Sequence, residues 1–183
     1  MEETNDWLTP ELILKTFFYR SDVFAVQSKT GAYFPVKRPI TIFDIIDHIE
    51  GKVTIGAYCI GDNNCVKWCC IDLDGQETEE DLSRMSNEAD TIYELFPEFP
   101  RMKEFSGRRG YHVWIFFKTP MKADLAKTII KARLNKANIY GNEIYPKQTE
   151  LNEGRKFGNL VKIPNAIHRK SGKRSVVLRH EGI

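Results

Sequence analysis

The order of six segments in the middle of the chain constrains its fold most. An apolar, β-branched run predicts a first strand, and a stretch with apolar residues every three or four positions predicts the helix that follows it. The complete series is strand 66–74, helix 78–96, strand 101–105, strand 111–117, helix 121–137 and strand 142–146. This β-α-β-β-α-β order is the split-βαβ unit, in which the spatial strand order is normally 4-1-3-2.

The fold class is therefore α+β, with an RRM-like (RNA-recognition-motif-like) βαββαβ core. Upstream, helices are expected at 10–20 and 41–50, and strands at 23–27, 32–36 and 53–60. This N-terminal αβ layer should cover part of the sheet face that the two core helices leave open. Two more short strands, in "GNLVKIP" and "SVVLR", flank a turn at "KSGK". We expect a single domain, with the layer at 1–62 and the core at 63–183.

Length and composition are those of an ordinary soluble globular protein. The chain has 183 residues, of which 42% are hydrophobic and 28% charged. It contains no stretch that could span a membrane and no signal peptide, so a cytoplasmic location is expected. The four cysteines match no zinc-binding spacing and are read as buried thiols in a reducing compartment. The net charge of +2 indicates no partner. Between residues 147 and 179, however, basic side chains outnumber acidic ones, which fits either binding of a polyanion or a solvated surface.

Two acids end the first core strand, in the segment "CIDLDG". Alternate residues of a strand share a face, so Asp72 and Asp74 project together. Like charges this close repel each other unless a cation or a basic group lies between them. On its own, an Asp-x-Asp-Gly string is more often a simple turn.

A second polar cluster is "FSGRRGYHVWIFF", residues 105–117. Its two glycines would let the backbone approach a ligand closely, and Ser106, Arg108 and Arg109 offer donors for phosphate. His112 opens the strand that follows. The alternative is a hairpin with a solvated basic tip and a histidine whose hydrogen bonds are satisfied.

The third cluster extends from Glu143 to Lys173. Taken singly, Glu143 could be an edge-strand charge, and Lys162 could reach solvent from its apolar strand. On the predicted fold, however, Asp72, His112 and Glu143 lie on three adjacent strands. Carboxylate oxygens suit Mg²⁺ or Mn²⁺, and two such ions can clamp the attacking and leaving oxygens of phosphoryl transfer.

Three segments, "CIDLD", "SGRRGYHVW" and "NLVKIPNAIHRKSG", resemble the signature segments of archaeo-eukaryotic primases, in the same order. The N-terminal stretch is similar to the bacterial branch, which includes primase domains of conflict systems and CRISPR-associated primase-polymerases. The resemblance covers most of the chain. The zinc insertion of many relatives is absent, and the chain ends soon after the last motif, so we expect a catalytic core that is a fragment of a longer protein.

The resemblance implies a role for each matching residue. Asp72, Asp74 and Glu143 would be the catalytic acids that hold two Mg²⁺ or Mn²⁺ ions, with no zinc. Nucleotide would be bound by Ser106, Arg109, His112, Lys162 and His168. Template or primer would be contacted by Arg108, Lys147, Arg169 and Lys173. The implied partners are single-stranded DNA template and primer, nucleoside triphosphates, and CRISPR adaptation proteins such as Cas1 and Cas2.

The sequence thus predicts a template-dependent nucleotidyltransferase, a DNA primase-polymerase that synthesises or extends primers. Two alternatives stay open. A non-catalytic RRM-like binding module would carry exposed aromatic residues on its central strands. A metal-dependent nuclease would share the acids but would not need so many basic groups for a triphosphate.

Overall fold

The structure, a computed structural model, describes residues 5–154 and 156–183. Its larger sheet has five antiparallel strands in the order β7-β4-β6-β5-β9. Their bounds are β4 Cys65–Asp74, β5 Arg101–Phe105, β6 Gly110–Lys122, β7 Glu143–Tyr145 and β9 Val176–Glu181. The predicted strand order 4-1-3-2 is confirmed, because β7, β4, β6 and β5 are the fourth, first, third and second core strands. The C-terminal strand β9 adds one edge beside β5.

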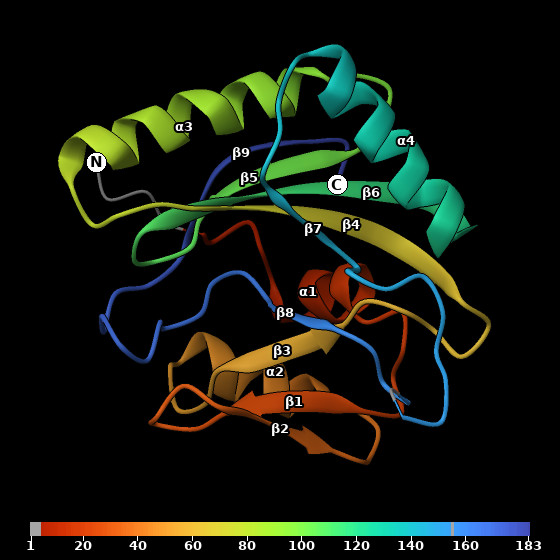
Figure 1. The fold of residues 1–183 in the computed structure, drawn as a ribbon. Helices are drawn as coiled ribbons and strands as arrows, with labels where there is room; N and C mark the ends of the chain where they lie inside the picture. The colour runs from red at the N-terminus through yellow and green to blue at the C-terminus, as the bar shows by residue number, and fades with distance from the viewer. Residues whose placement is uncertain (1–4, 155) are drawn as a thin grey trace.

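Two helices cover one face of this sheet, α3 (Glu79–Glu94) and α4 (Ala123–Lys136) (Figure 1). The hydroxyl of Thr78 caps the start of α3 by accepting the backbone N–H of Asp81. Met85, Ala89 and Ile92 lie three and four positions apart and are buried, so α3 packs on the sheet through the apolar side that its sequence predicts.

A second sheet lies on the other side of the molecule and has the strand order β2-β1-β3-β8 (Figure 1). Its strands are β1 Phe24–Gln27, β2 Tyr33–Val36, β3 Ile55–Tyr58 and β8 Leu160–Lys162. The N-terminal layer, expected within 1–62, therefore receives its fourth strand from the C-terminal part of the chain. Helices α1 (Pro10–Phe17) and α2 (Ile42–Ile49) complete this layer.

The hydrophobic core continues from one sheet to the other. Trp68 and Trp114 lie on the sheet face that α3 and α4 leave open, and their rings meet edge to face at 5.0 Å between centroids. The indole N–H of Trp68 donates to the carbonyl of Phe17, at the end of α1, over 3.0 Å. The N-terminal layer thus covers the open sheet face, as the sequence predicts.

Some element ends differ from the sequence-based ranges. The third core strand, expected at 111–117, extends over Gly110–Lys122, because its far end pairs with Cys65 and Val66 beyond an irregularity in the ladder. The first helix, expected to reach residue 20, ends at Phe17. None of the helices in the described part of the chain is both long and apolar enough to cross a membrane.

Candidate active site

One row of polar side chains crosses the larger sheet. Asp72 on β4 is in register with Glu143 on β7 and with His112 on β6, and His112 is in register with Glu104 on β5. Directly opposed residues of antiparallel strands point to the same face. The three strands that the sequence predicts to be adjacent therefore bring Asp72, His112 and Glu143 into one line.

Asp72 occupies the centre of this row and is largely buried. Its side chain is 20% exposed, and its Oδ1 lies 3.6 Å from Nε2 of His112. Burial raises the pKa of Asp72, His112 opposes this effect, and the nearby Asp74 and Glu143 add to it. A divalent cation beside Asp72 would relieve the cost of keeping this carboxylate ionised.

The other two predicted metal ligands are held by basic partners. Asp74 accepts from Nη2 of Arg109 over 3.0 Å. Glu143 accepts from Nζ of Lys147 over 2.8 Å and from the Tyr145 hydroxyl over 3.0 Å. The hydrogen bond from Lys147 is the main reason that the pKa of Glu143 is lowered.

Within residues 5–154 and 156–183, no three His, Cys, Asp or Glu side chains gather closely enough to hold a metal ion. The donor chemistry nevertheless fits Mg²⁺ or Mn²⁺, since all three groups are carboxylates. The ion pairs of Asp74 with Arg109 and of Glu143 with Lys147 are about half exposed. Surface pairs of this kind contribute little, so both acids can exchange their basic partners for a cation.

A cavity of about 230 Å³ lies next to this row. It brings together Ser106, Arg109 and His168 of the predicted nucleotide site, from two distant parts of the sequence. Arg108, which the sequence assigns to nucleic acid, lines the same cavity and pairs with Glu77. The remaining lining residues are Gln27, Gly31, Asp74 and Lys170. Its three basic side chains outnumber its one acidic side chain, so the cavity suits a phosphate chain.

His168 is oriented by the turn that carries it. Its Nδ1 accepts the backbone N–H of Ser171 over 3.3 Å, and the Ser171 hydroxyl donates to the carbonyl of Gly107 over 2.6 Å. A neutral imidazole whose Nδ1 accepts must carry its proton on Nε2. His168 therefore presents an N–H donor from its other ring nitrogen, which is the group that a phosphate oxygen needs.

Lys162 does not line the cavity, although the sequence assigns it to nucleotide. Its side chain is 9% exposed, its Nζ donates to the carbonyl of Ser106 over 2.9 Å, and Glu104 Oε1 is 4.0 Å away. Burial lowers the pKa of Lys162. This lysine extends from β8 of the second sheet to the end of β5, so it supports the cavity wall from behind.

The other predicted nucleic-acid contacts are spread over the surface. Lys147 is engaged by Glu143 at the edge strand β7. Arg169 and Lys173 lie on the turn 167–174, which is closed by a bridge between Ile167 and Arg174. The structure thus places these residues on two sides of the row and does not gather them into one groove.

Gly107 and Gly110 have a role that differs from the expected one. A Cβ on Gly110 would lie 2.2 Å from the carbonyl oxygen of Leu73, and one on Gly107 would lie 3.0 Å from that of Lys173. The close approach that these glycines permit is to the chain's own backbone. They let the 105–110 turn fit between β4 and the 167–174 turn.

Comparison with known proteins assigns the chain to a family. A family model described as the archaeo-eukaryotic primase domain of TOTE conflict systems matches residues 11–182. The chain belongs to this family. Its fold is similar to that of the primase domain of the cyanophage S-2L primase-polymerase, with a TM-score of 0.58 and 11% identity, over 96% of this chain and 90% of that one. No curated protein sequence matches the chain.

Sequence reasoning missed several residues at this site of the primase domain. Gln27 and Gly31 come from the β1–β2 hairpin and Lys170 from the C-terminal turn, and no local pattern predicts that these segments meet. Glu104 could have been predicted, because the sequence of the hairpin determines which residue it faces. A turn closed between Ser106 and Gly110 necessarily sets Glu104 opposite His112.

Proposed function

We propose that this domain is a template-dependent nucleotidyltransferase that synthesises or extends primers on a single-stranded DNA template. One observation supports the proposal most: the in-register row of Glu143, Asp72 and His112 ends beside a basic cavity that Asp74 also lines. Acids that bind metal and bases that bind phosphate are both required for phosphoryl transfer, and here they are neighbours.

In this proposal each group has one role. Asp72, Asp74 and Glu143 would hold divalent metal, which when bound supplies activation of a primer 3′-hydroxyl and neutralisation of phosphate charge. His168 donates Nε2–H to an oxygen of the triphosphate, and Arg108 and Arg109 exchange their carboxylate partners for phosphate. The family assignment supports this arrangement, because primase domains act on nucleotides.

The two alternative functions differ in what the site offers. In an RRM-like binding module, aromatic rings on the central strands would stack on bases. Here Trp68, Trp114 and Phe116 on the central strands are buried beneath the N-terminal layer. A nuclease would use the same carboxylates but has no need for the basic cavity. Both observations favour nucleotidyl transfer.

The test is incubation with a primed single-stranded template, Mn²⁺ and labelled nucleoside triphosphates. We expect extension by the parent, loss of at least a hundredfold in the double variant Asp72→Asn/Asp74→Asn, and full activity in Asp124→Asn. Asp124 is an exposed acid on α4, on the far face of the sheet, and is the matched control. Degradation of the template by the parent would support the nuclease, and binding without extension would support the binding module.

A further inference from the structure

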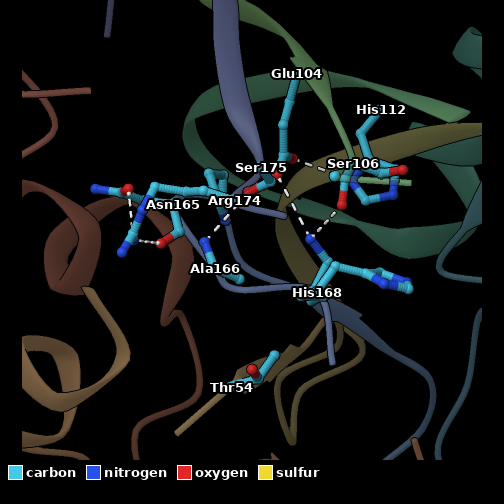
Figure 2. Close-up of polar contacts among 12 residues, drawn as sticks. Thr54, Glu104, Ser106, His112, Asn165, Ala166, His168, Arg174 and Ser175 are labelled. Carbon is cyan, nitrogen blue, oxygen red and sulfur yellow. Dashed lines mark hydrogen bonds and ion pairs between the residues drawn. The ribbon is translucent and has the colours of Figure 1, made fainter. Parts of the chain in front are cut away.

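Glu104 is a buried carboxylate at the end of the row. Its side chain is 0% exposed. Its Oε2 accepts from Nδ1 of His112 over 3.0 Å and from the indole N–H of Trp114 over 2.9 Å. Figure 2 shows Glu104 and His112 side by side, above the turn that carries His168. A charged group in such a position is costly unless it is paired and hydrogen-bonded, so its contacts require an explanation.

The surroundings of Glu104 favour its ionised form. Burial opposes ionisation, but His112 and Lys162 outweigh burial and hold the pKa of Glu104 below its usual value. An ionised carboxylate only accepts hydrogen bonds, and an indole N–H only donates. His112 Nδ1 must therefore carry a proton, and the ring cannot rotate by half a turn without losing this hydrogen bond.

With Nδ1 held in this way, the opposite edge of the ring faces the site. Nε2 of His112 lies 3.6 Å from Oδ1 of Asp72, one of the proposed metal ligands. A carboxylate that binds one ring nitrogen and so orients the other is a common support for functional histidines. We propose that Glu104 is a positioning residue, which fixes His112 so that Nε2 faces Asp72, where the incoming nucleotide would bind beside the proposed metal ligands. This inference rests on the proposed function.

A purely structural role for Glu104 makes a different prediction. The same oxygen binds Trp114, so Glu104 could serve only to satisfy the buried indole. Trp114→Phe removes the indole but leaves Oε2 and His112 in place. If the role of Glu104 is only structural, Trp114→Phe and Glu104→Gln should impair nucleotide binding equally when they lower stability equally. In our proposal only the change at Glu104 acts on nucleotide.

The first experiment is a double-mutant cycle read by nucleotide binding. A labelled nucleoside triphosphate is titrated in Ca²⁺ without primer, so that no turnover occurs. We expect Glu104→Gln to raise the dissociation constant about tenfold, and to raise it less than twofold in the His112→Ala background. Trp114→Phe should leave the constant within twofold of the parent. An equal loss in Trp114→Phe, or an undiminished effect of Glu104→Gln without His112, would overturn the proposal.

The second experiment does not depend on catalysis or on the folding of a Glu104 variant. In ¹⁵N-histidine-labelled parent protein, NMR reports which ring nitrogens carry protons, and His112→Ala identifies the signals among the four histidines. We expect a hydrogen-bonded proton on Nδ1 of His112, and a bare Nδ1 would overturn the proposal. A parent protein that shows this proton but binds no nucleotide would contradict the proposed function instead.

Discussion

His48 shows how one residue can hold two distant segments together. It is fully buried, its Nδ1 accepts the backbone N–H of Ile55 over 3.0 Å, and its Nε2 contacts the carbonyl of Pro164 at 3.0 Å. The first contact fixes the proton on Nε2, so the ring is neutral and donates to Pro164. His48 thereby connects β3 to the segment that leads into the 167–174 turn.

This arrangement predicts sensitivity to acid. Burial lowers the pKa of His48 from 6.5 to about 4. A lowered folded-state pKa means that the unfolded chain binds more protons, so this contribution is complete above pH 6.5 and is lost as pH falls toward 4. Between pH 7 and pH 5, the free energy of unfolding should fall by about 2 kcal/mol through His48 alone.

The measurement is urea unfolding at both pH values. His48→Gln should show a smaller fall than the parent, whereas His180→Gln, a change at the exposed histidine of β9, should match the parent. Equal pH dependence of the parent and His48→Gln would contradict this assignment of charge.

Single residues differ in how far sequence can predict them. Asp72 and His112 stand out because acids and histidines are unusual in apolar strands. His48 gives no such signal. Lys162 is also unusual in its apolar strand, but the sequence does not show what it binds, because its partner Ser106, like the partner Pro164 of His48, is more than fifty positions away. Their function depends on which backbone carbonyl they meet, and this is decided only when the two sheets pack.

The turn 167–174 is the element on which the cavity most depends. It presents His168 and Lys170 and is held by the hydroxyl of Ser171 on the carbonyl of Gly107. Gly107 has φ of +90°, and an added Cβ would lie 3.2 Å from Cβ of His168. Any side chain at this position must push the two turns apart.

We therefore expect Gly107→Ala to raise the apparent KM for nucleotide about tenfold and to cost roughly 1–2 kcal/mol or more of stability. The control is Gly172→Ala in the same turn, which has φ of +70° but nothing within 4 Å of the new Cβ. It should cost about 1 kcal/mol by strain alone and leave KM unchanged. Equal effects on KM would mean that backbone strain, and not displacement of His168, governs nucleotide binding.

Elements were more predictable than their pairings. The core helices and strands follow from local periodicity, and their order fixes the central sheet through the known split-βαβ topology. The pairing of β3 with β8 follows from no local rule, because Gly56 and Lys162 are far apart in the chain. Long-range pairing of short strands is decided by packing, and only the folded chain shows it.

At the scale of the whole molecule, the two sheets share one hydrophobic core. One continuous cluster contains Ile45 and Ile55 from the N-terminal layer together with Trp68, Trp114 and Val161. Lys162 adds a buried hydrogen bond between the sheets. Layers joined in this way should unfold as a unit.

We expect coincident urea transitions by tryptophan fluorescence and far-ultraviolet circular dichroism. Lys162→Met should shift both midpoints together, by about 1–3 kcal/mol in free energy, since it leaves the buried Ser106 carbonyl without its donor and removes the positive charge 4.0 Å from Glu104. Two separated transitions would show that the N-terminal layer and the core are independent units.

The pairing of β3 with β8 also has a consequence for synthesis. Ile55–Tyr58 leaves the ribosome about a hundred residues before Leu160–Lys162, its neighbour in the sheet. During that interval β3 is an unprotected, apolar edge, which is the kind of surface that pairs with other chains. A ribosome that stalls before residue 160 would therefore release an aggregation-prone fragment, because Leu160–Lys162, the strand that covers this edge of β3, has not yet been made.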